Sequence, residues 1–378
     1  MSHVDLDVAI VGGGIVGLAH ALAAARRGLS VAVFERGPRC TGASLRNFGT
    51  IWPIGQPPGE MLELARRSRH LWIELLESAS ISYQPTGSLH VAYRSDEVDV
   101  AREFAERAPD LGYDCVWLEA DAVAERSAAT VRRGLCGGLW SPGELTVDPR
   151  EVLSALPRYL VERHGVQMHF GCAVTSIELP IIRAGGSTFH ANAAIICSGD
   201  DFETLYPGAL QSAGMTRCKL QMMRTVPQPN GWRLGPVLAS GLTFQHYASF
   251  RVCASLEALK QRIAEETPEL NRWGIHILIS QTAAGEITIG DSHEYGPEVD
   301  VFDKREVDDL ITHAAQSFAN IAEWSIAQRW HGVYAKHPDK SFVSVSPAER
   351  VRVVTGLGGA GMTLSMGLAE VTMSELAL

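Results

Sequence analysis

The sequence lacks the patterns that mark several common classes of protein. Its seven cysteines include no C-x-x-C pair and are scattered along the chain, at positions 40, 115, 136, 172, 197, 218 and 253. We therefore predict neither a disulfide framework nor a metal site, and reduced thiols in a cytoplasmic protein fit better. No Lys or Arg precedes the first apolar segment, which argues against a secretory signal. No segment is long and apolar enough to span a bilayer, so no membrane association is expected.

Positive charge is scarce as well. The 378 residues include 33 Lys and Arg against 43 Asp and Glu, a formal net charge of -10. The chain as a whole should repel nucleic acid and anionic membranes, so an anionic ligand would need a local cationic pocket. Hydrophobic residues make up 46% and charged residues 20%, which is ordinary for a globular protein. The length exceeds that of one ordinary core, and two domains are predicted.

The first thirty-five residues show the pattern of a strand, a helix and a second strand. Residues 8–11 are a continuous apolar run, as in a strand that is buried on both faces. Residues 15–27 are rich in Ala and helical in character, and residues 29–35 form the second strand. This order predicts a buried βαβ unit at the start of the chain.

A G-x-G-x-x-G motif joins the first strand to the helix. Gly12 permits a tight turn, Gly14 lets the backbone approach a pyrophosphate, and Gly17 lets the helix pack closely on the strand. The helix start offers free N–H groups to the phosphates. Glu35 ends the second strand, where a carboxylate can accept hydrogen bonds from a ribose diol. The combination predicts a bound dinucleotide.

Three later segments favour FAD over NAD. Residues 40–49 form a loop with Gly and Ser in place of another strand and helix. Residues 193–197 form a short apolar strand that ends at Ser198-Gly199, where a second backbone contact to a cofactor would fall. Residues 351–355 form a strand that leads through a Gly-rich turn into a last helix, and this turn makes a second N–H-lined helix start. A long cofactor held by the first and last segments suggests FAD.

These features resemble the FAD-dependent oxidoreductases of the D-amino-acid oxidase fold, of the glycine oxidase and sarcosine oxidase type. The resemblance covers nearly the whole chain. It rests on the glycine motif with Glu35-Arg36 and on TGAS (41–44), VDPR (147–150), CSG (197–199) and TGLGGAGMTLS (355–365). It implies oxidation of an amine by hydride transfer to flavin N5, hydrolysis of the imine and release of hydrogen peroxide. It implies no catalytic side chain beyond the flavin.

The motifs and the resemblance together assign a set of residues to FAD. They are Gly12, Gly14, Ile15, Val16, Gly17, Glu35, Arg36, Ala43, Ser44, Asn47, Phe48, Gly49, Val174, Ser198, Gly199, Gly358, Gly359, Ala360, Gly361, Met362 and Thr363. Attachment of FAD is expected to be non-covalent. Where sarcosine oxidases carry their C-terminal attachment Cys this chain has Gly332, no Cys follows Cys253, and no His lies between His20 and His70.

The resemblance implies an α/β fold, α+β overall, with a Rossmann-like FAD-binding domain interleaved with an antiparallel-sheet substrate domain. The FAD-binding domain would comprise residues 1–82, 141–214 and 331–378, and the substrate domain residues 83–140 and 215–330. Local patterns agree, because residues 87–93 alternate like a strand and residues 273–292 resemble two strands with a hairpin at 283–286.

One departure from the family's pattern bears on the substrate. Members that bind carboxylates carry W-x-G-x-R near the C-terminus, whereas this chain has Tyr334 at the Arg position, after Trp330 and Gly332. A phenol cannot give the two-pronged charged grip of a guanidinium. The cation for an anionic substrate must then come from elsewhere. The predicted substrate-binding residues are Arg46, Gln56, His246, Tyr247, Arg251, Tyr334, Lys336 and His337.

Several of these assignments have an alternative. Arg46 binds the substrate anion, which we favour, or pairs with a flavin phosphate, or is an ordinary surface residue. His246 and Tyr247 either pack on a strand face or contact the ligand. The remaining histidines, such as His70 and His90, are expected to be structural.

The loop at 44–60 points to a substrate class. Together with KLQMMRT (219–225), SLRNFGTIWPIGQPPGE is similar to a subgroup associated with bacterial aminophosphonate breakdown. We therefore predict an FAD-dependent amine oxidase that deaminates or N-dealkylates a substrate such as 2-aminoethylphosphonate, with molecular oxygen as acceptor. A glycine, sarcosine or D-amino-acid oxidase is the alternative. An FAD dehydrogenase subunit of a larger complex is an alternative from another class. The sequence leaves the oligomeric state open.

Overall fold

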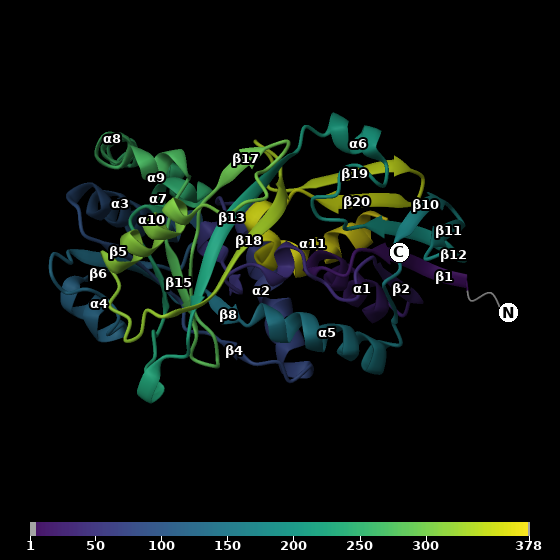
Figure 1. The fold of residues 1–378 in the computed structure, drawn as a ribbon, viewed down its shortest axis with the longest axis horizontal. Helices are drawn as coiled ribbons and strands as arrows, with labels where there is room; N and C mark the ends of the chain where they lie inside the picture. Colours follow the sequence, from purple (N-terminus) through teal and green to yellow (C-terminus); the bar gives the residue numbers. More distant parts are fainter. Residues whose placement is uncertain (1–4, 377–378) are drawn as a thin grey trace.

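The computed structural model describes residues 5–376 and arranges them around two large sheets (Figure 1). The eight-stranded sheet lies at the end of the molecule that holds both termini, and the nine-stranded sheet lies at the other end. A third, small sheet consists of β3 (Thr50–Ile51), β8 (Leu145–Val147) and β4 (Tyr83–Gln84). The predicted mixed α/β fold is confirmed. Among the described residues, no helix has both the length and the apolar character that a bilayer crossing requires.

Parallel strands from distant parts of the chain form the centre of the eight-stranded sheet. In spatial order its strands are β10 (Val174–Glu178), β11 (Ile181–Ala184), β12 (Ser187–Ile196), β1 (Asp5–Val11), β2 (Val31–Glu35) and β9 (Gln167–Phe170). In addition, β20 (Val351–Thr355) pairs with β12, and β19 (Val343–Ala348) pairs with β20. β1 runs parallel to both β12 and β2, so the carboxyl ends of the three strands meet at one edge.

Helices cover one face of this sheet and form the main apolar core. They are α1 (Ile15–Arg26), α2 (Glu60–Ser78), α5 (Pro149–His164) and α11 (Gly361–Glu375). Val8 and Ile10 of β1 pack into that core, whereas Ala9 and Val11 pack into a second cluster on the opposite face. Burial on both faces explains the unbroken apolar run of this strand. The short helix α6 (Pro207–Ser212) contributes Leu210 to the second cluster.

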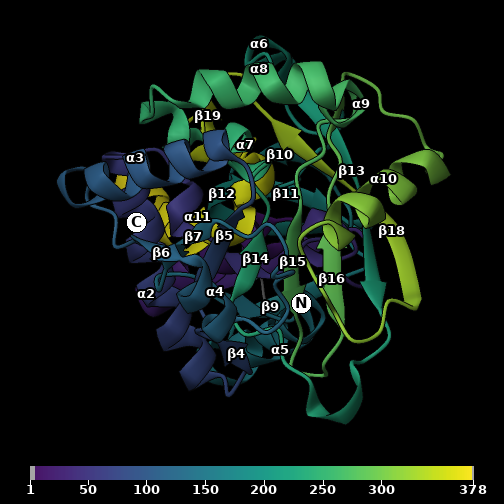
Figure 2. The same ribbon diagram turned by 90° about the vertical axis from the view of Figure 1, so that its left-hand side faces the viewer.

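The nine-stranded sheet is almost entirely antiparallel. Its strands follow one another as β17 (Glu294–Gly296), β13 (Thr216–Thr225), β16 (Ile287–Gly290), β15 (Leu278–Gln281), β14 (Val237–Ala239), β5 (Ser88–Ala92), β7 (Gly137–Ser141) and β6 (Val116–Glu119), with β18 (Ile326–Lys336) paired to β13. Figure 2 shows β5, β14, β15, β16, β13 and β18 in this order across the molecule. The one parallel pair is β14 with β5 among the described strands of this sheet.

Helices and short helical turns surround the nine-stranded sheet. The helices are α3 (Ser95–Leu111), α4 (Ala120–Arg126), α7 (Thr243–His246), α8 (Leu256–Glu266), α9 (Pro268–Arg272) and α10 (Arg305–Gln316). The 3-10 turns of the chain are η1 (Ala43–Leu45), η2 (Pro53–Gly55), η3 (Pro229–Gly231), η4 (Ala248–Val252) and η5 (Gly358–Ala360). Two of these turns, η1 and η5, lie at the proposed cofactor site described below.

The observed elements extend two of the predictions. The predicted strand at 193–197 is the end of the longer β12, whose first half pairs with β11. The predicted domain boundary at residue 331 falls inside β18, which pairs with β13 as far as Lys336. If the two domains are divided by sheet, the last segment of the FAD-binding domain begins only after Lys336.

Candidate active site

The turn after β1 is so close to its neighbours that only glycine fits at two positions. Gly12 has φ +104, and a Cβ there would lie 2.3 Å from the carbonyl oxygen of Cys197. A Cβ on Gly17 would lie 2.0 Å from the carbonyl oxygen of Gly12. The Gly12 N–H also donates to the Phe34 carbonyl at 2.8 Å, which ties the turn to β2. This close packing brings the start of α1 to the ends of both strands.

The start of α1 is suited to a phosphate. Gly14 caps the helix without a side-chain hydrogen bond, and the first turn carries no acidic residue. The positive end of the helix dipole therefore favours an anion. Ser44 Oγ accepts a hydrogen bond from the Ile15 N–H at 3.0 Å, which places η1 against this helix start. Val16 follows in the same first turn.

Glu35, the residue predicted to contact a ribose, ends β2 beside the Gly-rich turn. Its two carboxylate oxygens accept hydrogen bonds from the Gly13 and Gly37 N–H groups, both at 2.8 Å. Its carbonyl accepts the Cys172 N–H at 2.9 Å, so the chain that leads into Val174 runs beside the end of β2. The neighbouring Arg36 instead reaches outward and pairs with Asp201 at 2.9 Å, with most of its side chain exposed.

The segment after β12 offers open backbone at the same edge. A Cβ on Gly199 would meet no atom within 4 Å. Its carbonyl accepts a hydrogen bond from Thr355 Oγ1 at 2.6 Å, which fixes the segment to the end of β20. Ser198 Oγ donates to the Asp201 carbonyl at 3.2 Å. The predicted contacts at Ser198 and Gly199 would therefore be made by backbone that the protein already holds in place.

Asn47 organises the loop that follows η1. Its Nδ2 donates to the carbonyls of Ala43 and Ser44 at 3.0 and 2.9 Å, and its Oδ1 accepts the Gly49 N–H at 2.7 Å. The Phe48 carbonyl accepts Ser280 Oγ at 3.1 Å, which joins the loop to β15. The side chain of Asn47 thus shapes the loop, and the backbone is left to face a ligand.

A second Gly-rich turn, η5, begins α11 and lies against the end of β18. Lys336 forms an isolated β-bridge with Leu357. A Cβ on Gly358 would lie 3.7 Å from the Lys336 side chain and 3.8 Å from the Tyr334 ring. A Cβ on Gly359 would lie 3.9 Å from the Tyr334 hydroxyl. The predicted substrate residues on β18 are therefore next to the second predicted cofactor turn.

The start of α11 is itself anchored to distant elements. The Met362 carbonyl accepts Trp72 Nε1 of α2 at 2.7 Å, and Thr363 Oγ1 accepts the Trp52 N–H at 2.9 Å. A Cβ on Gly361 would meet no atom within 4 Å. Two glycine-lined helix starts, the carboxylate of Glu35 and the open backbone at Gly199 suit a long dinucleotide such as FAD.

Three histidines converge beside these turns, and we call His246, His276 and His293 the imidazole cluster. His246 ends α7, His276 precedes β15, and His293 follows β16. One ring nitrogen from each lies within 4.8 Å of the other two. The ring centroids of His246 and His276 are 3.7 Å apart, and that of His293 lies 4.6 and 5.1 Å from them. Three separate segments thus meet at one point.

Asp291 lies behind the imidazole cluster. Its carboxylate oxygens are 3.2 Å from His276 Nε2 and 3.9 Å from His293 Nε2. Burial raises the pKa of Asp291 well above its usual range. Burial also lowers the pKa of His293 to about 4 and that of His276 well below its usual range. Burial therefore favours the uncharged forms of Asp291 and of the imidazoles.

A row of polar side chains continues the site across three strands. The register pairs Cys218 of β13 with Tyr295 of β17 on one side and with Tyr334 of β18 on the other. The Tyr334 ring lies 6.5 Å from the His293 ring, centroid to centroid. Lys336 Nζ lies 5.4 Å from the Tyr295 ring centroid. Burial lowers the pKa of Lys336, and the nearby positive charge of Arg251 lowers it further.

The structure separates the predicted substrate residues into two groups. His246, Tyr247, Tyr334 and Lys336 belong to the region of the imidazole cluster, since the rings of His246 and Tyr247 are 5.0 Å apart. Arg251 lies on η4, exposed, and its charge contributes to the lowered pKa of His246.

The other three predicted substrate residues make contacts within the protein. Arg46 Nη1 donates to the His331 carbonyl at 3.1 Å. Gln56 is buried, and its carbonyl accepts the Tyr113 hydroxyl at 2.5 Å. His337 Nδ1 lies 2.9 and 3.0 Å from the N–H groups of Asp339 and Lys340, so it accepts both within its own turn. These contacts suit a structural role for the side chains of Arg46 and His337, whereas the contact at Gln56 is made by its backbone.

Sequence reasoning missed His276, Asp291 and His293. The predicted hairpin at 283–286 contained the signal, because extending its ladder brings His276 opposite the chain at 291–292. In the structure His276 and Asp291 exchange backbone hydrogen bonds of 3.3 and 2.9 Å. The alternation of Asp291, His293 and Tyr295 then suggests one polar face.

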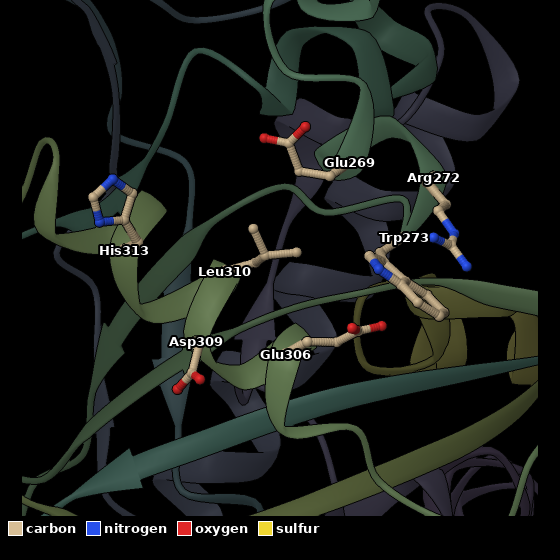
Figure 3. Close-up of a pocket in the computed structure, with 7 residues that line it drawn as sticks. All are labelled: Glu269, Arg272, Trp273, Glu306, Asp309, Leu310 and His313. Carbon is tan, nitrogen blue, oxygen red and sulfur yellow. The ribbon is translucent and has the colours of Figure 1, made fainter.

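A surface hollow of about 460 Å³ lies on the outer side of the nine-stranded sheet, between α9 and α10 (Figure 3). It is lined by Glu269, Arg272, Trp273, Glu306, Asp309, Leu310 and His313. None of these residues belongs to the imidazole cluster, although the Trp273 carbonyl accepts the His293 N–H at 2.7 Å. Its excess of carboxylates does not suit an anionic ligand, and the predicted cofactor and substrate residues lie elsewhere, at the two Gly-rich turns and the imidazole cluster.

The chain is similar to known flavin enzymes. The family described as FAD dependent oxidoreductase matches residues 7–374. A glycine oxidase from Geobacillus kaustophilus is 28% identical over 211 residues, which cover 53% of this chain and 55% of the relative. The chain thus spans about half the length of that relative.

Two solved structures share the fold over nearly their full length. Glycine oxidase from Bacillus cereus superposes with a TM-score of 0.78 at 18% identity, covering 98% of this chain and 95% of that chain. L-alpha-glycerophosphate oxidase from Mycoplasma pneumoniae, with FAD bound, superposes with a TM-score of 0.76 at 17% identity, covering 99% and 95%.

Proposed function

Because this chain belongs to the family of FAD dependent oxidoreductases, we propose that it oxidises a small amine that carries a phosphonate group. FAD is the cofactor and, when bound, supplies the two-electron oxidation of the C–N bond. The observation that carries the proposal is Tyr334, which replaces the carboxylate-binding Arg of the family pattern and lies close to Lys336, His293 and η5.

The donors around Tyr334 suit a phosphonate better than a carboxylate. A phosphonate presents three oxygens and up to two negative charges, so it is best held by several N–H and O–H groups from different directions. Lys336 provides an ammonium, Tyr247 and Tyr334 provide hydroxyls, and His246 provides a ring nitrogen. Arg46 is a weaker candidate for the main contact, because its Nη1 already binds the His331 carbonyl.

The chain's own residues would bind and orient the substrate. Lys336 and Tyr334 lie against Gly358 and Gly359, so an anion held by them stays next to the cofactor turn. The same strand supports non-covalent binding of FAD, since the position of the family's attachment Cys holds Gly332. A Cβ there would already lie 3.1 Å from the Arg46 carbonyl oxygen. Acid precipitation of the holoenzyme should therefore release all of the flavin into the supernatant.

Matched substrate pairs test the proposal. Glycine would be compared with aminomethylphosphonate, β-alanine with 2-aminoethylphosphonate, and sarcosine with N-methylaminomethylphosphonate, because each pair shares the amine and differs in the acid. We expect kcat/KM for the phosphonate of the preferred pair to exceed that of its carboxylate by about a hundredfold, which corresponds to one or two charged hydrogen bonds. Peroxide release and anaerobic bleaching of the flavin would both be recorded. Preference for the carboxylate in all three pairs would contradict the proposal.

A glycine or sarcosine oxidase is the second candidate, favoured by the 28% identity to a glycine oxidase. It predicts turnover of the carboxylate members of the pairs. Flavin bleaching by substrate without peroxide in air would instead identify a dehydrogenase that passes its electrons to another acceptor.

A further inference from the structure

We propose that the imidazole cluster, with Asp291 behind it, is the subsite that binds the phosphonate of the substrate as a tetrahedral oxyanion. The inference rests on the proposed function and assigns ligand-binding roles to His276 and His293, two residues outside the set predicted from the sequence. It also predicts that protons accompany the anion into the site.

The three rings differ in how deeply they are buried. His276 and His293 are 3% and 6% exposed, whereas His246 and the adjacent Tyr247 remain partly exposed. Solvent therefore reaches the cluster at His246, whereas His276 and His293 are covered by the protein. His293 is held from the back, since its Nδ1 lies 3.0 Å from the Gly274 carbonyl. A carbonyl can only accept, so Nδ1 carries a hydrogen and Nε2 is the atom directed toward the cluster.

The charges around the cluster favour an anion over a cation. The positive charges of Lys336 and Arg251 both lower the pKa of His246. The charge of Lys336 also lowers the pKa of His276 and of His293. The other titratable groups that face the cluster from neighbouring elements are His90, Cys218, Tyr247, Tyr295 and Tyr334, which are neutral or cationic when protonated. Among the described residues at this place, Asp291 is the one carboxylate within ion-pair distance of a ring.

The ring geometry also suits an anion better than a metal ion. The His246 and His276 rings overlap at a centroid distance of 3.7 Å with an angle of 33° between their planes. Rings that lie over one another do not direct their nitrogens from the separate corners that a tetrahedral metal site needs. They can still donate N–H groups to different oxygens of one large oxyanion.

Proton uptake follows from the burial of the cluster. Burial holds the imidazoles neutral in the empty protein, and a nearby anion favours the imidazolium form. Asp291 lies 3.2 Å from His276 Nε2, and burial favours its neutral form, so it does not oppose an anion bound to the rings. Binding of a dianion should therefore draw protons from solvent and should strengthen as the pH falls from 8.5 to 7.

The experiment is calorimetric titration of the FAD-loaded enzyme with methylphosphonate at pH 7.5, in buffers of different ionisation enthalpy. The wild-type protein should take up protons on binding, and acetate should bind about tenfold more weakly or not at all. His276→Gln and His293→Gln should each weaken methylphosphonate binding about tenfold or more and reduce proton uptake. His313→Gln, on α10 and outside the site, is the matched control and should change neither quantity. An unaltered flavin spectrum would show that each variant is folded.

The outcomes separate this inference from the proposed function. Unchanged methylphosphonate binding in both folded variants would overturn the inference, even if aminophosphonates are oxidised. If methylphosphonate bound through the cluster but no aminophosphonate were oxidised, the anion site would be supported and the proposed function would be contradicted. A stoichiometric transition metal that is lost in both variants would overturn the inference in favour of a metal centre. A marked preference for inorganic phosphate over methylphosphonate would remove the cluster from substrate binding.

Discussion

At the scale of single residues, Gly12 provides the sharpest test of the cofactor turn. Its left-handed backbone costs any other residue about 1–2 kcal/mol, and a Cβ there would lie 2.3 Å from the Cys197 carbonyl oxygen. We expect Gly12→Ala to weaken FAD binding at least about tenfold and to destabilise the apoprotein by more than the backbone term alone. Flavin fluorescence titration and thermal unfolding measure the two effects.

Gly28 is the matched control for this change. It follows α1 with φ +80, and a Cβ there would meet no atom within 4 Å. Gly28→Ala therefore imposes a similar backbone strain without a clash and away from the phosphates. It should lower the thermal stability and leave the affinity for FAD unaltered. Equal loss of FAD affinity in both variants would contradict the steric role of Gly12.

Residues whose role is local were predictable, and residues whose role depends on distant partners were not. Gly12 and Glu35 belong to one βαβ unit, so a fixed spacing predicts their places. His276 and His293 meet His246 only through the folding of the nine-stranded sheet. Arg46 was predicted from its position in the chain, but the carbonyl of His331 that it contacts comes from β18.

At the scale of elements, the loop at 44–60 and α11 are joined by a buried hydrogen bond. Thr363 Oγ1 accepts the Trp52 N–H at 2.9 Å, and both residues are at most 4% exposed. Thr363→Val would leave that N–H buried without a partner, at a cost of about 1–3 kcal/mol. We expect a lower unfolding midpoint for the holoenzyme and slower or weaker FAD binding, measured by urea unfolding and flavin fluorescence.

Thr372 of the same helix gives a control of identical chemistry. It is also buried, and its Oγ1 donates to the Leu368 carbonyl, which keeps its place in the helical ladder. Thr372→Val should therefore change the unfolding midpoint much less than Thr363→Val. If the two variants were equally unstable, the link to Trp52 would not be what holds the loop.

Element boundaries show the limit of pattern reasoning at this scale. The strand at 351–355 was predicted with its observed ends, because apolar residues fill it and a Gly-rich turn closes it. The domain boundary at residue 331, which came from the family resemblance, falls inside β18, a strand that local patterns did not predict. Its length is set by pairing with β13, a partner about a hundred residues away in the chain.

At the scale of the whole molecule, buried histidines should make stability depend on pH. His90 is packed among Trp52, Phe244 and Phe250, and burial lowers its pKa to about 3. Between that value and 6.5 the unfolded chain binds a proton that the folded chain does not, so stability is lost as the pH falls. The loss approaches about 1.4 kcal/mol per pH unit.

Replacement of His90 separates its contribution to the pH dependence of stability from contributions of opposite sign. One of these comes from Glu144, whose pKa is raised by burial. His90→Leu should be more stable than the wild-type protein at pH 5 by a margin that shrinks toward pH 7, followed by thermal unfolding across that range. His70→Gln, with a side chain 76% exposed on α2, is the control. A margin that does not vary with pH would show that His90 is not the source.

The bridge between Lys336 and Leu357 has a mechanical consequence. β18 is paired with β13 along its length, and its last residue, Lys336, forms a β-bridge with Leu357 beside the turn that begins α11. The two sheets are therefore connected at the place where we propose that substrate and flavin meet. We expect substrate to enter by movement of side chains and of the loop at 44–60, and the two sheets to keep a constant spacing throughout turnover.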